Sequence, residues 1–523
     1  MNWFRNSESL WGRVPIAVVG GLLLATSFPS FNFGVGAFIG VFLTLIAINR
    51  MTFFKSFFVG FIGGFAFYGL VLIWLTTYLG PIPWAALTII EALIFGLGCA
   101  IISVVWRWFN SMKNRSLANA LTAVAIGAIY TGREYVAGHF PFGGLPWARL
   151  GLSQVDNPLA KWAWAIDIAG LSWLIVSVSA LITIKFLHPL PQGFGLRARF
   201  QNWGSASIAL LLTALVPLGI GLIKPEPSGT LRVAAVQGNA NAGLFADNPP
   251  GSILDKHLTV AKELVSSGGA DGVELMVWPE NSSDLDPITM VEPNLKITNF
   301  VNEELKAPLL FGNKTFRGSD FYNEVDLWLP EKGIADWYDK KRPVPFGEYV
   351  PYRSFFMALA PSMIGLIGWD MSPGVRDGIF EVKDNVEVGS LICFEVTIDE
   401  LNYDLIDSGA QALMIQTNSS DFGRSVQGVQ LAAISRMRAI ETGRTVVSIS
   451  TVGVSGIYAP DGSVMQELES FKPDYMVEDI ELHKGKTPAM IFGRYIEPLA
   501  FGIAIALFLL AVASTLLGKR RAK

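Results

Sequence analysis

The distribution of apolar residues along the chain constrains the fold more than any other feature. The 523 residues are 51% hydrophobic and only 16% charged, which is too apolar for a soluble domain of this length. A helix needs about 20 apolar residues to cross a hydrocarbon core of about 30 Å. The sequence predicts eight such spans, at 14–30, 34–49, 56–78, 84–106, 116–133, 163–187, 204–223 and 496–518. Residues 1–223 would form a transmembrane domain of seven spans, and 495–523 a last span with a basic tail.

Positive charges alternate between the predicted loops and so predict the topology. The loops on one side carry most of the Lys and Arg residues, including the tail at 519–523, whereas the short loops on the other side hold Arg133, Arg149 and Lys161. By the positive-inside rule, both termini lie in the cytoplasm and the block 224–494 lies across the membrane. In a bacterium this is an inner-membrane protein with a periplasmic block. The first apolar run is expected to be an uncleaved anchor, because seven others follow it.

The polar block 224–494 alternates between strand-like and helix-like patterns. Strands are expected at 231–238, 273–280, 308–316, 324–329, 335–338, 386–396, 412–417 and 445–451. Helices are expected at about 253–265, 398–407 and 427–441. Two sheets covered by helices on their outer faces would satisfy this count, so the block is predicted to be an α/β domain.

Three residues with catalytic chemistry stand at or near the ends of predicted strands in this block: Glu280, Lys340 and Cys393. The only other cysteine, Cys99, lies in an apolar run, so Cys393 is predicted to be a free thiol. Taken singly, each residue has an ordinary explanation, namely an exposed strand-end acid, a solvated basic loop and a buried core thiol. Together they supply a base, a cation and a nucleophile, which indicates acyl transfer through a thioester.

Further motifs surround these residues. Glu348 follows Lys340 within Val-Pro-Phe-Gly-Glu-Tyr-Val-Pro, and Cys393 stands in Ile-Cys-Phe-Glu. With Thr-Asn at 417–418 and the run from Arg436 to Arg444, they make nearly the whole chain resemble the apolipoprotein N-acyltransferase family, the membrane-bound branch of the nitrilase (carbon–nitrogen hydrolase) superfamily. This resemblance implies an α-β-β-α sandwich for 224–494.

The chain departs from the family pattern at two positions. The family commonly has Tyr directly after the cysteine, where this chain has Phe394, and Trp ahead of Phe-Gly, where it has Asp421. These differences concern lipid gating rather than the chemistry.

The resemblance implies a role for each site residue. Glu280 is expected to be the proton acceptor, Lys340 to stabilise the thiolate and the oxyanion, and Cys393 to be the nucleophile. Glu348 would orient Lys340 or contact the substrate amine. The remaining supporting residues are Glu395, Phe394 and Asn418.

The implied reaction is the last step of lipoprotein maturation. A glycerophospholipid gives its acyl chain to Cys393, and the N-terminal amine of a diacylglyceryl-cysteine lipoprotein then takes it in a ping-pong sequence. Neither a cofactor nor a metal is expected to take part, no nucleic acid partner is indicated by the net charge of -4, and a monomer is the default.

Two other functions stay open from the sequence alone. A membrane-tethered amidase or nitrilase would use the same residues but release the acyl group to water. A transporter or lipid flippase would use the block only for binding, and it predicts charged residues at mid-span, of which Glu91 is a candidate.

Several residues near the predicted membrane boundary also have two explanations. Arg133, Glu134 and Arg149 could hold a phosphate head group or pair with one another. The aromatic segments 140–147 and 78–84 could form a lipid entrance or an interfacial belt.

Overall fold

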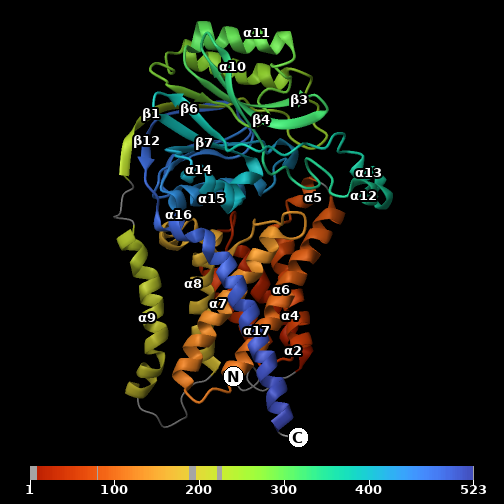
Figure 1. The fold of residues 1–523 in the computed structure, drawn as a ribbon, viewed down its shortest axis with the longest axis vertical. Coiled ribbons are helices and arrows are strands. Elements are labelled where there is room, and N and C mark those ends of the chain that lie inside the picture. The colour runs from red at the N-terminus through yellow and green to blue at the C-terminus, as the bar shows by residue number, and fades with distance from the viewer. Residues whose placement is uncertain (1–8, 79, 188–195, 221–225, 522–523) are drawn as a thin grey trace. The chain divides into compact units, whose positions relative to one another are not determined.

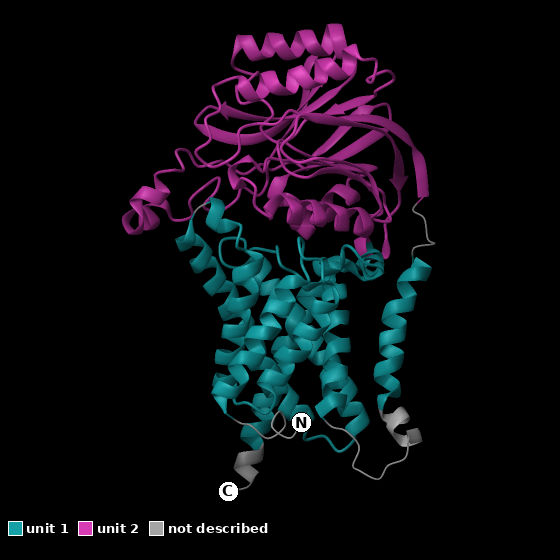
Figure 2. Cartoon of the chain, turned by 180° about the vertical axis from the view of Figure 1, so that it is seen from behind, with its two compact units in different colours: residues 1–223, 491–523 teal, residues 224–490 magenta. Residues whose placement is uncertain are grey.

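The chain forms two compact units, which are coloured separately in Figure 2. The computed structural model describes residues 9–78, 80–187, 196–220 and 226–521. Unit 1 consists of residues 1–223 and 491–523 and is built from helices, whereas unit 2 consists of residues 224–490 and contains all the strands (Figure 1).

Each of the eight predicted apolar segments forms a helix in unit 1. The long helices are α2 (Leu10–Thr26), α3 (Val35–Ile48), α4 (Phe53–Val71), α6 (Pro81–Phe109), α7 (Arg115–His139), α8 (Trp162–Leu187), α9 (Leu196–Ile220) and α17 (Ile496–Arg521). The short ones are α5 (Leu75–Tyr78), η1 (Leu150–Gln154), η2 (Pro158–Lys161) and η6 (Gly493–Tyr495). The first helix begins and ends four residues earlier than the predicted 14–30, at Leu10 and Thr26. The seventh segment ends at 223, outside the described residues.

Five helical segments of the described chain are long and apolar enough to cross a membrane. They are Phe53–Val71, Pro81–Phe109, Pro158–Leu187, Trp203–Ile220 and Pro488–Leu517. Helices α2 and α3 are apolar but have only 17 and 14 residues. Helix α7 carries Arg133 and Glu134 and is outside the five. The count of eight spans therefore stays a prediction.

The helices of unit 1 approach one another at glycines. A Cβ atom added to Gly21 of α2 would lie 2.1 Å from the carbonyl oxygen of Gly63 in α4, so this contact requires glycine. Lipid tails are as apolar as Leu, and helices inside a bilayer therefore gain stability mainly from such close van der Waals contact.

Arg133 of α7 is enclosed inside unit 1. It is 6% exposed, donates to the hydroxyl group of Tyr68, and lies 4.0 Å from the centroid of the Tyr130 ring. Its Nη2 is 3.6 Å from Oε1 of Glu134. The cavity beside it has a volume of about 10 Å³, which suffices for one water molecule and not for a phosphate group. These contacts favour the ion-pair explanation of Arg133 over the head-group explanation.

Unit 2 contains two six-stranded sheets. Their strand orders are β12-β1-β2-β3-β4-β5 and β11-β10-β9-β8-β7-β6. Strands β1, β2 and β3 are parallel to one another, as are β7, β8 and β9, and the outer strands pair antiparallel. The strands are β1 (Glu226–Gln237), β2 (Leu275–Val277), β3 (Leu309–Arg317), β4 (Asp320–Leu329), β5 (Gly333–Asp339), β6 (Ile379–Lys383), β7 (Val386–Ile392), β8 (Ala412–Thr417), β9 (Thr445–Ser450), β10 (Ser455–Tyr458), β11 (Val464–Leu468) and β12 (Asp474–Lys484).

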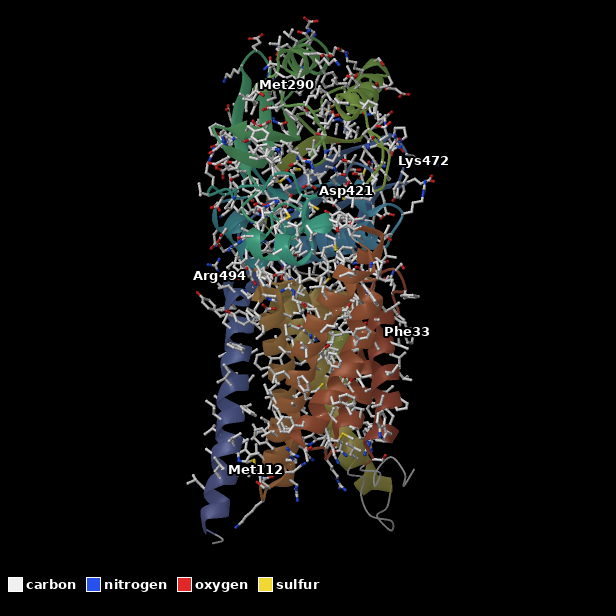
Figure 3. All side chains as sticks on the ribbon, turned by 90° about the vertical axis from the view of Figure 1, so that its right-hand side faces the viewer. Phe33, Met112, Met290, Asp421, Lys472 and Arg494 are labelled. Atoms are coloured by element: carbon white, nitrogen blue, oxygen red, sulfur yellow. The ribbon has the colours of Figure 1, made fainter. Side chains whose placement is uncertain are left out.

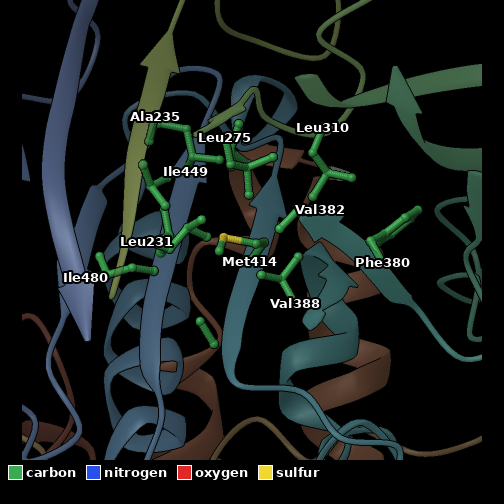
Figure 4. Close-up of a cluster of buried hydrophobic side chains, with 14 of the residues drawn as sticks. Leu231, Ala235, Leu275, Leu310, Phe380, Val382, Val388, Met414, Ile449 and Ile480 are labelled. Carbon is green, nitrogen blue, oxygen red and sulfur yellow. The ribbon is translucent and has the colours of Figure 1, made fainter. Parts of the chain in front are cut away.

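Buried apolar side chains from both sheets meet in one cluster. Figure 4 shows Leu310 of β3 and Met414 of β8 in this cluster. A second cluster joins the other face of the first sheet to the helices above it, with Trp278 and Phe300 among its members. The helices of unit 2 are α10 (Ser252–Ser266), α11 (Val291–Asn299), η3 (Phe300–Leu305), α12 (Arg353–Leu359), α13 (Pro361–Ile364), η4 (Cys393–Thr397), α14 (Asp399–Asp407), η5 (Ser420–Phe422), α15 (Gln427–Thr442) and α16 (Pro488–Phe492), which ends in unit 1.

The α/β prediction for this block is confirmed. The predicted strands at 412–417 and 445–451 correspond to β8 and β9. The sequence also predicts a hairpin turn at Pro460-Asp461-Gly462, and this turn joins the antiparallel strands β10 and β11, whose bounds were not predicted. Strands β6 and β12 had no prediction. In β12 the alternation of Met476, Ile480 and Leu482 is interrupted by Glu478, which pairs with Val233 of β1. Only the tertiary pairing makes that segment a strand.

Strand β4 carries two buried acidic residues. Glu324 and Asp326 are 0% exposed, and Arg317 contacts the carboxylates of Glu324 and Asp339. Asn313 donates from Nδ2 to Oδ2 of Asp326 over 3.2 Å. Burial, followed by the charge of Glu324, raises the pKa of Asp326 well above its ordinary value. We infer that the pair shares one proton at neutral pH.

Asp326→Asn is expected to weaken the pH dependence of stability of unit 2. A carboxyl group whose pKa is raised on folding stabilises the protein below its unfolded pKa and loses this contribution as the pH rises through the folded pKa. Burial raises the pKa of Glu324 to about 7, so the pair loses stability near and above neutrality. The amide does not titrate, and the variant should be more stable than wild type by about 1 kcal/mol at about pH 8.5, but not at about pH 5.5.

Thermal unfolding of the full chain in detergent at both pH values measures this difference. Asp320→Asn, an exposed change on the same strand, is the control. Equal pH dependence in the Asp326 variant and in wild type would contradict the shared proton.

Candidate active site

Glu280 lies in the turn that follows β2. Pro279 precedes it, and the N–H of Gly312 in β3 donates to the carbonyl oxygen of Pro279 over 3.1 Å. A Cβ atom on Gly312 would lie 2.6 Å from the Cα atom of Glu280, so a glycine is required for this turn to pack on β3. The side chain of Glu280 is thereby held in the interior, where the residue is 4% exposed.

Lys340 follows β5 and is the central cation of the site. Its backbone N–H donates to the carbonyl oxygen of Asn323 over 2.8 Å, which ties it to β4. Its Nζ lies 3.4 Å from Oε1 of Glu280 and 2.8 Å from Oε1 of Glu348. Burial by itself lowers the pKa of Lys340, but the carboxylates of Glu348 and Glu280 outweigh it and the net shift is upward. The ammonium group therefore stays charged although the residue is 1% exposed.

Asn323 of β4 donates hydrogen bonds to the carboxylates of both Glu280 and Glu348. Its Nδ2 donates to Oε1 of Glu280 over 2.7 Å and to Oε1 of Glu348 over 2.8 Å. The other oxygen of Glu348 accepts the N–H of Val344 over 2.6 Å. The turn containing Glu348 is thus closed on itself and connected to the sheet.

Cys393 stands at the sharp turn between β7 and η4. Its backbone φ is +54°, in the left-handed region that residues other than glycine adopt at a cost of about 1–3 kcal/mol. The thiol is partly exposed. Glu280, Lys340 and Glu348 all act on it electrostatically, and the backbone N–H of Asn418 favours its ionised form.

The surroundings of Cys393 favour the neutral thiol over the thiolate. Burial and the negative charge of Glu280 raise the pKa of Cys393 well above its ordinary value, although Lys340 opposes them. Lys340 therefore does not hold a preformed thiolate at this site. The expected stabilisation of the thiolate by Lys340 applies only after the thiol has lost its proton. A base that removes the proton during attack is therefore required.

Glu395 connects three segments around the Cys393 turn. It is 0% exposed and accepts hydrogen bonds from the hydroxyl group of Tyr338 and from the N–H groups of Arg342 and Ile392, each over 3.0 Å. This acid therefore joins β5, the loop after Lys340 and the Cys393 turn.

Arg438 of α15 holds the far end of the same turn. Its guanidinium group is 0% exposed and donates to the carbonyl oxygens of Val396 and Thr397 over 2.8 and 2.9 Å. It also donates to Asp399 over 2.6 Å and contacts Glu441. The buried charge is fully paired, and it fixes the carbonyl groups that end η4.

The remaining predicted residues lie around this centre. Phe394 follows Cys393 in η4 and is partly exposed. The side chain of Asn418 accepts the N–H of Ser420 over 3.0 Å. Asp421, labelled in Figure 3, is exposed in η5 and near Lys314.

Sequence reasoning missed Asn323 and the buried role of Arg438. Asn323 occupies the same face of β4 as Val325 and Leu327, which are both core residues. A polar residue on an otherwise apolar strand face was the available signal. Arg438 lay in a recognised motif, but nothing in its spacing indicated that it contacts the segment after Cys393.

Alkylation of Cys393 by iodoacetamide tests the electrostatics of the site. Only the thiolate reacts, so the rate is expected to be low at neutral pH and still rising at about pH 9. Glu280→Gln removes a negative charge and should accelerate the reaction, whereas Lys340→Met should slow it, each by roughly tenfold. Changes of opposite sign cannot come from unfolding, which would expose the thiol in both variants. A rate that is independent of pH between about 6 and 9 would refute the neutral resting thiol. A Cys99→Ala background leaves Cys393 as the only thiol.

The chain is similar to known proteins over both units. The sequence model of the apolipoprotein N-acyltransferase N-terminal domain matches residues 20–181, and that of carbon-nitrogen hydrolase matches residues 232–487. An amidase from Nesterenkonia sp. of known structure is 17% identical, with a TM-score of 0.37, and the match covers 49% of this chain and 92% of that one.

Two relatives that match more than nine-tenths of the chain carry the same name. The apolipoprotein N-acyltransferase of Mycolicibacterium smegmatis is 30% identical over 95% of this chain and 84% of its own length. That of Geobacter metallireducens is 27% identical over 92% of this chain and 91% of its own length. The protein described here is therefore an acyltransferase that belongs to the apolipoprotein N-acyltransferase family.

Proposed function

We propose that the chain transfers an acyl chain from a glycerophospholipid to the N-terminal amine of a diacylglyceryl-cysteine lipoprotein, through a thioester on Cys393. The observation that carries the proposal is the contact of Lys340 with Glu280 and Glu348 beside Cys393, in a chain that also contains membrane-length apolar helices. The name of the relatives agrees with this reaction.

The first half reaction forms the thioester. Glu280 accepts the thiol proton while Sγ of Cys393 attacks the ester carbonyl carbon. The oxyanion that results is stabilised by the ammonium group of Lys340 and the N–H of Phe394, and each such donor can lower the barrier by about 3 kcal/mol. The tetrahedral intermediate then breaks its bond to the glycerol oxygen, which takes the proton from Glu280 and leaves as the lysophospholipid.

The second half reaction forms the amide. The neutral α-amine of the lipoprotein attacks the thioester carbon, and Glu280 accepts one of its protons. The same donors stabilise the second oxyanion, and the C–S bond then breaks. The thiolate takes the proton back from Glu280, which restores the neutral thiol.

Glu348 acts through Lys340 in this scheme. Its Oε1 is 2.8 Å from Nζ, and its Oε2 is occupied by the N–H of Val344. Both oxygens are therefore used within the protein, which supports a positioning role over a contact with the substrate amine.

The membrane setting suits two lipid substrates. An acyl chain that moves from bilayer to site without crossing water avoids a cost of about 0.8 kcal/mol for each methylene group. We infer from the charge distribution that both termini lie in the cytoplasm, that eight helices span the inner membrane and that unit 2 is periplasmic. We also propose that unit 2 is an α-β-β-α sandwich and that the enzyme is a monomer.

Incubation with phospholipid in the absence of an acceptor is expected to add one acyl group to the protein. Intact mass spectrometry should detect the adduct in wild type and not in Cys393→Ala, because the remaining cysteine, Cys99, is buried. Glu280→Gln should lower the rate of adduct formation by a factor on the order of 10² to 10⁴, since it removes the general base. Cys99→Ala is the matched control and should react like wild type. Acylation that persists in Cys393→Ala would refute the nucleophile.

A labelled acyl chain distinguishes the transferase from a membrane-tethered amidase. With a diacylglyceryl peptide present, the label is expected on the peptide amine, because the lipid setting limits access of water to the thioester. Release of the label mainly as free fatty acid would support hydrolysis instead.

Labelling with a membrane-impermeant maleimide tests the orientation. In a variant that lacks Cys99 and Cys393, a thiol at Asp461→Cys should react in intact cells with a permeable outer envelope, because Asp461 is exposed in unit 2. A thiol at Lys113→Cys, between α6 and α7, should react only after the inner membrane is opened. The reverse pattern would place unit 2 in the cytoplasm.

A further inference from the structure

Asn323 is a buried polar side chain that contacts both glutamates of the site. It is 1% exposed, and each hydrogen of its amide group has its own acceptor, Oε1 of Glu280 at 2.7 Å and Oε1 of Glu348 at 2.8 Å. Lys340 donates to the same two oxygens. Two donors from different elements therefore converge on one pair of oxygens.

The chemistry of the acceptors fixes the orientation of this amide. Its Oδ1 accepts no hydrogen bond from the described residues, so the reverse orientation would leave Nδ2 without acceptors and place Oδ1 against two carboxylates. An NH₂ group satisfies both acceptors at once, which no single hydroxyl group can do.

The charge balance of the cluster explains why such a donor is needed. Glu280 and Glu348 carry two negative charges, and Lys340 supplies one positive charge. Carboxylates that share a site tend to take up a proton, because like charges oppose ionisation of both. Hydrogen bonds donated to the two carboxylates counteract this uptake of a proton. A neutral donor such as an amide does so without bringing a further charge that would compete for the substrate.

The donors also make the two carboxylate oxygens of Glu280 different from each other. In the part of the chain that the structure describes, every side-chain hydrogen bond of Glu280 goes to Oε1. Oε2 is therefore the oxygen that remains to take a proton from the thiol.

We propose that Asn323 is a positioning residue for acyl transfer, which holds Glu280 and Glu348 in their ionised forms and reserves Oε2 of Glu280 for the proton of Cys393. This inference rests on the proposed function, in which Glu280 is the general base.

The test is the pH dependence of acyl-adduct formation in a single turnover of the full chain with phospholipid. In Asn323→Leu, which keeps the size but loses both donors, the acidic limb of the profile should move up by about one pH unit, so that the rate below it falls about tenfold. The KM for phospholipid should change little. In Asn323→Asp the new carboxyl group can donate a hydrogen bond only when it is protonated. The rate of adduct formation in this variant should therefore recover as the pH falls, whereas the rate in Asn323→Leu should fall.

Asn313→Leu is the matched control. Asn313 lies on the neighbouring strand β3, is 0% exposed, and donates to Asp326 and Asp286, which are outside the site. Its loss should lower stability without moving the acidic limb. Identical profiles for wild type, the Asn313 control and both Asn323 variants would overturn the role of Asn323 and leave the acyl transfer intact. A wild type that forms no adduct would overturn both. If Asn323→Leu fails to fold, the direction of the pH effect in Asn323→Asp decides.

Discussion

The burial of one ammonium group is the constraint on which the site depends. Lys340 is 1% exposed, and a charge so enclosed is unstable unless partners compensate it in good geometry. Glu280 and Glu348 provide this compensation at 3.4 and 2.8 Å. Since each of the three residues follows a different strand or turn, the ion pairs also join those segments, and the catalytic geometry and the local stability have the same origin.

The same charges determine how the thiol can react. Two carboxylates and burial oppose ionisation of Cys393 more than one ammonium group favours it. The surroundings of Cys393 therefore favour the neutral thiol, and a base would have to take its proton before the sulfur could act as a nucleophile.

The surrounding protein holds the nucleophile in an unusual backbone conformation. Cys393 has a φ of +54°, and the turn that contains it is anchored by Glu395 on one side and by Arg438 on the other. Both anchors are fully buried and paired with backbone groups. In unit 1, Arg133 follows the same rule, since it is enclosed by Tyr68, Tyr130 and Glu134. Each of these three buried charges has partners close by.

Features that depend on local pattern could be predicted from the amino-acid order alone. Hydropathy was sufficient for the apolar helices, short apolar runs for β8 and β9, and residue order for Glu280, Lys340 and Cys393 as candidates. Three features depend on the folded chain. Asn323 reaches Glu280 across 43 residues, Arg438 holds the turn that follows Cys393, and the surrounding charges favour the neutral thiol. Periodicity states which face of a strand a side chain occupies, but its partner depends on how strands far apart in the chain align, and the pKa of a group depends on those partners and on burial.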